Sequence, residues 1–397
     1  MIFLNISCKP RNIESDLIRN YSLEQSDDIV PAAERVRLYV PLLQGKRVAL
    51  AVNHSSMVRN RHLLDTMLSL DVQVVVLFSP EHGLRGTADA GATIANSQDR
   101  QTGLPIISLY GTKKKPTADD LKNVDVVVFD IQDVGTRFFT YISTLHYLMD
   151  ACAEFDKEII VLDRPNPNGH YVDGPVLDTA YRSFVGMHPV PIVYGLTIGE
   201  YANMINGEKW LTNHRTAKLT VIPCAGYTHN SMYKPHVKPS PNLPDIKSIL
   251  VYPSTCLFEG TVVNEGRGTD KPFQIFGHPA YKKDGFKYTP MKRPGAASPK
   301  LLGVECYGTD LSAFSENDLW RWRKINLDYL IDYYQVIKPQ ETVFFNKATF
   351  DRLAGSSLLR EQIEKGMTAE QIRATWQTGL LAYKKIRSKY LLYPDFQ

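Results

Sequence analysis

A glutamate, a histidine and an arginine stand close together in the glycine-containing segment 80–86, as Glu81, His82 and Arg85. This segment follows the apolar run 74–78, whose β-branched residues are typical of a parallel strand buried on both faces. Ligands of open α/β sheets bind at the carboxyl ends of such strands. Apolar neighbours would raise the pKa of Glu81, which suits a general acid, and His82 is placed to orient it.

Five strand-like runs organise the first part of the chain, at residues 47–52, 74–78, 106–110, 124–130 and 158–162. Helical patterns, including 60–70 and 141–155, lie between them, so the alternation predicts a Rossmann-like, doubly wound and mostly parallel sheet. Polar residues follow these strands and should converge at one edge of the sheet. They are Asn53, His54, Asp130, Gln132, Asp133, Asp163, Arg164 and Asn166.

The pattern changes after this part of the chain. Residues 187–253 are rich in proline and aromatic residues, which predicts a long connection, and a second glycine-containing cluster at 258–270 carries Glu259, Arg267 and Thr269. Thr368 is a candidate N-cap for a helix at 369–389. We therefore expect an N-terminal extension (1–40), a Rossmann-like catalytic domain (41–245) and a smaller α+β domain (246–397) that completes the cleft.

Composition excludes several function classes. The 397 residues are 43% hydrophobic and 22% charged with a formal net charge of +4, an ordinary globular mixture. The lysines are scattered, which disfavours nucleic-acid binding, and the run 113–115 is interpreted as a solvated loop. No segment is apolar for long enough to span a membrane, and the N-terminus does not form a complete signal peptide, so export and a cytoplasmic location both stay open.

Common cofactor motifs are absent. The sequence has no GxGxxG after the first strand, no GxxxxGK[ST] loop, no GxSxG elbow and no HExxH helix, so we expect no nucleotide or other cofactor. His54, Glu81, His82, Asp130 and Asp133 could together form a mixed metal site. Their histidines lack a recognised ligand spacing, and no metal is expected.

Hydrolysis of a glycosidic bond fits the remaining residues, because it needs two carboxyl groups beside the bond. Glu81 is the expected acid, and the second carboxylate is Asp130 or Asp133, with Glu259 as a third choice. A metal-assisted hydrolase of modified sugars stays open as another function class.

Several segments together resemble one family, the NamZ-type exo-β-N-acetylmuramidases, which process peptidoglycan. The resemblance extends from about residue 45 to residue 393. The matching segments are Asn53-His54-Ser55-Ser56, Pro80-Glu81-His82-Gly83-Leu84-Arg85-Gly86, Asp130-Ile131-Gln132-Asp133-Val134-Gly135-Thr136-Arg137, Asp163-Arg164-Pro165-Asn166-Pro167, Glu259-Gly260-Thr261 and Gly266-Arg267-Gly268-Thr269.

This resemblance implies a Rossmann-like domain without a nucleotide, a cleft between two domains, and release of N-acetylmuramic acid from the non-reducing end of peptidoglycan-derived glycans. It also implies a periplasmic or cell-envelope location. Attack by the acetamido group of this sugar stays an alternative mechanism, and a non-catalytic binder of peptidoglycan fragments stays an alternative function. Arginine is a favoured partner for the lactyl carboxylate of this sugar, and Arg85 and Arg267 are preferred over Arg137 and Arg164. The expected substrate-binding set is Asn53, His54, Arg85, Gln132, Arg137, Tyr141, Asp163, Arg164, Asn166, Glu259, Arg267 and Thr269.

Overall fold

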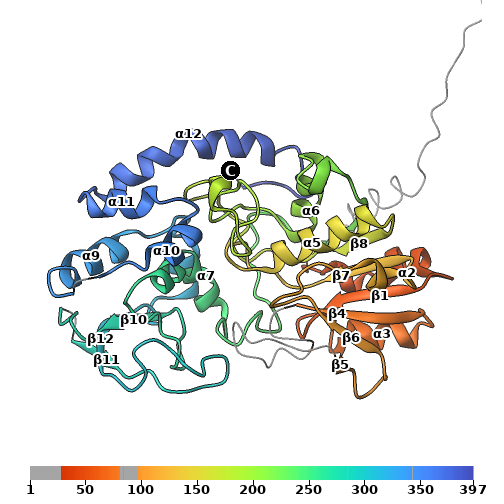
Figure 1. Cartoon of the computed structure of the whole chain (residues 1–397), viewed down its shortest axis with the longest axis horizontal. Helices are drawn as coiled ribbons and strands as arrows, with labels where there is room; N and C mark the ends of the chain where they lie inside the picture. Colours follow the sequence, from red (N-terminus) through yellow and green to blue (C-terminus); the bar gives the residue numbers. More distant parts are fainter. Residues whose placement is uncertain (1–27, 81–83, 85–96, 284, 342, 397) are drawn as a thin grey trace, which may run out of the picture.

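A seven-stranded sheet organises the N-terminal half of the computed structural model, which describes residues 28–80, 84, 97–283, 285–341 and 343–396 (Figure 1). Its strand order is β5-β6-β4-β1-β7-β8-β9, and β5 is the antiparallel edge strand. The strands are β1 (Val48–Val52), β4 (Val74–Ser79), β5 (Ser97–Gln98), β6 (Pro105–Ser108), β7 (Val126–Asp130), β8 (Glu158–Leu162) and β9 (Lys218–Ile222).

The strand order is that of a doubly wound fold. The chain passes from β1 outward to β4 and β6, and then returns to β7 on the other side of β1, so the direction of winding switches between β1 and β7. In such sheets ligands bind outside the carboxyl ends of the strands at this switch point. The predicted Rossmann-like, mostly parallel sheet is confirmed.

Side chains of the sheet alternate between two apolar layers, as the pleat requires. Val48 and Leu50 pack with the buried residues of α2 and α3, whereas Ala49 and Ala51 pack with those of α5 and α6. The helices of this half are α2 (Val36–Leu43), α3 (Leu63–Ser69), α4 (Ala118–Leu121), α5 (Tyr141–Glu154) and α6 (Ile198–Gly207). A hairpin of β2 (Met57–Val58) and β3 (Arg61–His62) precedes α3.

The C-terminal half combines helices with a three-stranded antiparallel sheet of order β10-β12-β11, confirming the predicted α+β character. Its strands are β10 (Ile275–His278), β11 (Phe286–Tyr288) and β12 (Cys306–Asp310). Its helices are α7 (Ile246–Thr255), α8 (Glu316–Trp320), α9 (Asp328–Ile337), α10 (Lys347–Ala354), α11 (Leu358–Glu364) and α12 (Ala369–Arg387). Short 3-10 turns lie at η1 (Ala32–Glu34), η2 (Thr179–Tyr181), η3 (Thr212–His214) and η4 (Cys256–Gly260).

Two predicted elements differ from the structure. The helix expected at 60–70 begins at Leu63, because Arg61 and His62 pair in the hairpin. The stretch expected as an irregular connection contains α6, the start of α7 and the edge strand β9, whose exposed Lys218 and half-buried Leu219 lack the fully apolar signature of a central strand. The predicted cap is confirmed, since Thr368 forms a capping box with Gln371 at the start of α12.

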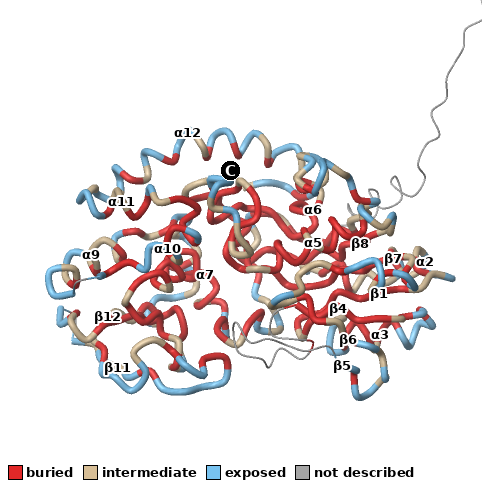
Figure 2. Tube along the Cα trace, viewed as in Figure 1, coloured by how far each residue is buried: buried red, intermediate tan, exposed pale blue. Residues whose placement is uncertain are grey.

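One apolar core extends across both halves. The layer beneath α5 and α6 continues into buried residues of α9, α10 and α12, so the two halves pack together rather than forming separate cores. In Figure 2 buried residues are concentrated in the strands of the large sheet and in α7, whereas α12 carries exposed residues along its outer side. Within the described residues, no helix is long and apolar enough to cross a membrane.

Arg137 joins the two halves from a fully buried position. Its guanidinium donates hydrogen bonds to the carbonyl oxygens of Pro175 (2.9 Å) and Val190 (2.6 Å), and to those of Leu353 (3.0 Å) and Ala354 (2.7 Å) near the end of α10. A buried cation needs such acceptors, because it has lost its hydration. These contacts explain its burial without a ligand.

The C-terminal tail returns to the sheet and covers Asp163. The Tyr393 hydroxyl donates to this buried carboxyl group at 2.5 Å, and the Thr197 hydroxyl (2.8 Å) and Gly199 amide (2.7 Å) donate to it as well. Burial raises the pKa of Asp163 to about 7, despite these hydrogen bonds. Asp163 therefore fastens the tail and α6 to the end of β8.

Replacing Arg137 with methionine should lower thermal stability strongly, because four buried carbonyl oxygens would lose their donor. We expect a loss of about 3 kcal/mol or more, or roughly 5 °C in the unfolding midpoint measured by calorimetry. The exposed Arg37→Met variant is the matched control and should change the midpoint little. Equal shifts in the two variants would contradict the proposed joining role.

Asp163 should make stability fall as pH rises. The folded protein keeps the Asp163 proton up to about pH 7, whereas an unfolded aspartate loses it near its ordinary pKa of 3.8. The contribution of Asp163 to the free energy of unfolding therefore declines between these two pH values and is constant above them. The difference in unfolding free energy between the wild type and Asp163→Asn should therefore decline from pH 5 to 7, by at most about 1.4 kcal/mol per pH unit. Urea titrations across this range measure it, and a pH-independent difference would contradict the shifted pKa.

Candidate active site

The polar residues that follow β1, β7 and β8 converge at one edge of the sheet, as predicted. The Ser56 hydroxyl bonds to the carbonyl oxygen of Asp130, and the Gln132 amide donates to the Ser55 hydroxyl at 3.1 Å. The Gln132 side chain then donates to the carbonyl oxygen of Pro165, which follows β8, at 2.8 Å. These contacts cross-link three successive strand ends.

A buried ion pair lies at the switch point. Arg164 donates from Nε and Nη2 to the two carboxylate oxygens of Asp130 at 2.5 and 2.8 Å, and the side chains are 5% and 0% exposed. Arg164 also donates to the carbonyl oxygen of Met57 at 3.1 Å. Burial opposes the charge of Arg164, but the attraction of Asp130 outweighs it and raises the pKa of the guanidinium. Both predicted site residues are thus bonded to each other.

Asp133 is enclosed in the same region. The hydroxyl of Tyr194 and the amide of Gly135, the latter at 2.7 Å, both donate to its Oδ2 atom. Burial raises the pKa of Asp133 to about 7. Its neutral form is favoured below that pH, but the side chain lines none of the cavities described below.

The remaining predicted residues of the strand ends bond mainly to nearby backbone or to one another. The side chain of Asn53 bonds to Ser55 and to the Tyr141 hydroxyl, at 2.9 and 3.0 Å, and His54 contacts the carbonyl oxygen of Lys238 at 2.8 Å. Asn166 donates to the carbonyl oxygen of Leu196 and accepts from the amide of Asn168. Thr269, in the loop before β10 of the C-terminal half, donates to the carbonyl oxygen of Gly266. These contacts fix the loops in place.

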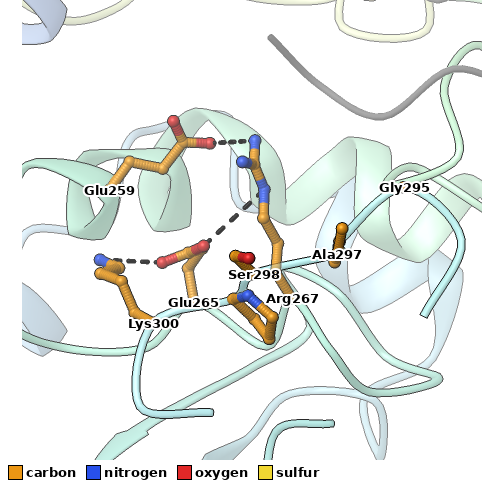
Figure 3. A pocket seen from close by; sticks show the side chains of 9 residues that line it. Glu259, Glu265, Arg267, Gly295, Ala297, Ser298 and Lys300 are labelled. Atoms are coloured by element: carbon orange, nitrogen blue, oxygen red, sulfur yellow. Dashed lines mark hydrogen bonds and ion pairs between the residues drawn. The ribbon is translucent and has the colours of Figure 1, made fainter. Parts of the chain in front are cut away.

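Two adjoining cavities lie beside this edge. The first, of about 310 Å³, is lined by residues of both halves, and we call it the aromatic cavity. The second, of about 350 Å³, is lined by residues 259–300 of the C-terminal half, and we call it the polar cavity (Figure 3). Glu259 and Arg267 line both of them. The aromatic lining consists of Tyr110, Phe138, Phe139, Tyr141, Phe184, Tyr252 and Phe273.

Four charged side chains alternate in sign across the polar cavity (Figure 3). Arg267 donates to Glu259 at 2.7 Å, and its Nε atom lies 3.7 Å from Glu265, whose second oxygen is 2.9 Å from Lys300. Glu259 and Arg267 are 24% and 26% exposed, whereas Glu265 is 3% exposed. The Glu259–Arg267 pair is therefore the more accessible one, whereas Glu265 lines the polar cavity but is almost completely buried.

Local structure sets these positions. Gly266 and Gly268, on either side of Arg267, adopt φ angles of 80° and 85°, which favour glycine. Lys300 donates to the carbonyl oxygens of Phe258 and Thr261, at 2.6 and 3.1 Å, and so holds the turn that carries Glu259. Burial opposes ionisation of Glu265, but Lys300 and then Arg267 outweigh it and lower the pKa of Glu265. Burial likewise opposes the charge of Arg267, and Glu259 and Glu265 raise the pKa of this guanidinium.

The structure brings only part of the predicted set to a cavity. Tyr141, Glu259 and Arg267 line the aromatic cavity, and Gln132 and Arg164 line a small neighbouring one. Glu81, His82 and Arg85 lie outside the described residues, so their predicted roles stay predictions. Arg137 and Asp163, predicted to bind substrate, have the structural contacts given above. No cluster of three or more His, Cys, Asp or Glu suited to a metal occurs in the described parts of the chain.

Sequence reasoning missed Lys300 and most of the aromatic lining. Lys300 follows a proline in a segment without any motif, and no sequence signal pointed to its contact with Glu265. Tyr110 is the last residue of the strand predicted at 106–110, whereas β6 ends at Ser108, so an accurate strand end would have placed it among the residues that follow the strand. The other rings come from distant segments that only the tertiary structure brings together.

Comparisons with known proteins agree over nearly the whole chain. A family model described as the N-terminal part of exo-beta-N-acetylmuramidase NamZ matches residues 48–247, and the model of its C-terminal part matches residues 250–393. The protein named peptidoglycan beta-N-acetylmuramidase NamZ from Bacillus subtilis (strain 168) is 40% identical over 375 residues, which cover 89% of each chain.

Two crystal structures of DUF1343 family proteins from Bacteroides fragilis NCTC 9343 have the same fold. One is 48% identical with a TM-score of 0.86, and the match covers 93% of this chain and 99% of that one. The other is 29% identical with a TM-score of 0.76, and covers 93% and 100% of the two chains. Because both family models match in order and together span most of the sequence, this chain belongs to the exo-β-N-acetylmuramidase NamZ family.

Proposed function

We propose that this protein is a glycosidase that releases N-acetylmuramic acid from the non-reducing end of peptidoglycan-derived glycans, as part of cell-wall turnover. Family membership and the 40% identity to the Bacillus subtilis enzyme support this activity. The observation that carries the chemistry is the Glu259–Arg267 pair, which lies on the wall shared by two cavities. The pair offers a carboxylate for the cleavage reaction and a cation for binding the carboxylate of an acidic sugar.

Glu259 is the carboxylate that we assign to the ionised role. A glycosidase needs one carboxyl group that gives a proton to the leaving oxygen and one ionised group that acts as nucleophile, as base or as the partner of the 2-acetamido group. The bond from Arg267 suits the ionised role, because a guanidinium is a strong partner for a negatively charged carboxylate. Asp130 and Asp133 fit this role less well, since neither lines the aromatic or the polar cavity.

Glu81 keeps the proposed role of general acid, with His82 orienting it. The support is its position in the sequence shortly after β4, a strand whose carboxyl end lies at the same sheet edge as those of β1 and β6. The aromatic cavity includes Tyr110, which follows β6. A sugar ring stacked on such aromatic side chains would lie between the strand ends and Glu259.

Arg267 is proposed to bind the lactyl carboxylate of N-acetylmuramic acid. Its guanidinium is a planar donor group suited to carboxylates, and its side chain is partly exposed between the two cavities. The hydrogen bond that the Arg267 guanidinium donates to Glu259 comes from its Nη2 atom, which leaves Nη1 as the donor that we propose for the lactyl carboxylate.

We also propose that the protein works in the cell envelope or periplasm. The support is the substrate class alone, since peptidoglycan-derived glycans arise there.

Glu81→Gln and Glu259→Gln should each lower turnover of a chromogenic N-acetylmuramide by about 10²-fold or more, because each removes one of two carboxyl groups needed at the bond. The rate of chromophore release measures the effect, and thermal unfolding checks folding. The exposed Glu305→Gln variant is the control and should retain the wild-type rate. Near-normal turnover of a folded Glu81 or Glu259 variant would remove that residue from the mechanism.

Arg267→Ala should weaken muramide binding roughly 10- to 100-fold, the range for a lost charged hydrogen bond, with little effect on a glucosaminide that lacks the lactyl group. Calorimetric titration with the two free sugars measures both affinities. Arg293→Ala serves as control, because Arg293 pairs with Asp270 away from the cavity lining. Equal losses for both sugars would show that Arg267 does not recognise the lactyl carboxylate.

A further inference from the structure

Three consecutive lysines follow β6, and two of them have carboxylate partners. Lys113 lies 2.6 Å from Asp120, and Lys115 lies 2.5 Å from both Asp150 and Glu154. For these two, the sequence-based interpretation as a loop of ordinary surface charges agrees with the contacts.

Lys114 has a different environment. Its ammonium group lies 4.7 Å from the centre of the Phe184 ring, within the range of a cation–π contact. In the described part of the chain, no carboxylate forms an ion pair with Lys114. Its positive charge is therefore held at an aromatic surface rather than neutralised by an acidic side chain.

This aromatic surface belongs to the cavity. Phe184 and Tyr110 both line the aromatic cavity, and their ring centres are 5.9 Å apart. On another side Phe184 stacks on Tyr147, with an interplanar angle of 21°. The Ser143 hydroxyl donates to the carbonyl oxygen of Phe184 at 2.7 Å and fixes its backbone. The three rings are only partly buried, so they form a rim with room for a ligand.

Lys114 and Arg267 are linked to the aromatic cavity from different halves of the molecule: Arg267 lines it, and Lys114 contacts Phe184, which lines it. Arg267 lies on the wall that the C-terminal half provides, beside Glu259, whereas Lys114 follows the sheet strand β6 and contacts a ring of the N-terminal half. A glycan that is cleaved from its end extends from the terminal sugar toward the solvent. Its further muramic acid units carry carboxylates, as lactyl groups or as stem peptides attached to them.

We propose that Lys114, held over Phe184, binds a carboxylate of the glycan on the leaving-group side of the cleaved bond and so favours anionic substrates. This inference rests on the proposed function and deepens it. Tyr110 and Phe184 supply faces for sugar rings, and Lys114 supplies the charge. The lactyl group of the second muramic acid and the carboxylates of its stem peptide are the two possible sources.

Lys114→Met tests the proposal, because methionine keeps an apolar chain near Phe184 and removes the charge. Lys113→Met is the matched control, since Lys113 is the neighbouring lysine and pairs with Asp120, whereas Lys114 contacts the Phe184 ring. KM is measured on three substrates: a chromogenic N-acetylmuramide with a neutral leaving group, a peptide-free muramyl tetrasaccharide, and the same tetrasaccharide with stem peptides. Dissociation constants for the two tetrasaccharides are measured by calorimetry at low and at 0.5 M salt.

Relative to the neutral substrate, we expect Lys114→Met to raise KM for an anionic substrate about three- to fivefold. Its binding of the anionic tetrasaccharide should weaken by the same factor at low salt and not at 0.5 M salt, because salt screens the charge. An effect on the peptide-free tetrasaccharide assigns the lactyl group, and one confined to the peptide-bearing form assigns the stem peptide. Equal changes on all substrates, or values equal to those of Lys113→Met, overturn the proposal.

Failure of the proposed function has a separate signature. If the wild-type protein releases no N-acetylmuramic acid from any substrate, the glycosidase assignment fails. The calorimetric titrations then decide the role of Lys114 alone: loss of tetrasaccharide binding in Lys114→Met supports it, and unchanged binding overturns it.

Discussion

The buried ion pair between Asp130 and Arg164 occupies the position at which doubly wound folds commonly bind a ligand. It lies at the switch point between β1 and β7, where doubly wound sheets commonly hold a nucleotide. Hydrogen bonds that join the ends of β1, β7 and β8 surround it. Because side chains fill this position, the larger cavities lie beside the sheet edge, toward the C-terminal half, and the sheet serves mainly as their support.

The position of Glu259 and Arg267 relative to the sheet edge depends on the two halves sharing one core. The aromatic cavity takes its lining from both halves, so its shape requires that they do not move apart. Arg137 bonds to carbonyl oxygens of both halves, and Tyr393 returns to the end of β8. Arg137 and the tail tyrosine are distant from the charged pair in sequence, yet they hold the framework that positions it.

The sequence predicted the sheet well and the site only in part. All five expected strands form, because fully buried parallel strands leave a clear β-branched signature, whereas the edge strand β9 lacks it. Polar residues at strand ends were predicted to bind substrate, but a residue type does not reveal whether its partner is a ligand or the protein itself. Asp163 bonds to Tyr393, 230 residues away in the chain, and Arg137 to Ala354, 217 away; only the fold discloses such partners.

Burial also separates the carboxyl groups into two chemical classes. Asp133 and Asp163 are enclosed, and burial raises the pKa of each to about 7, so both are poor candidates for a permanently ionised catalytic group near neutral pH. Glu259 lies at the cavity wall, with an arginine that favours its charge and with access to a ligand. A glycosidase needs a proton donor and an ionised group beside the same glycosidic bond. A carboxyl group that is enclosed by the protein cannot contact this bond, so it can fill neither role. The requirement for access is therefore our reason for proposing the ionised role for Glu259, at the wall of two cavities, rather than for the carboxylates at the strand ends.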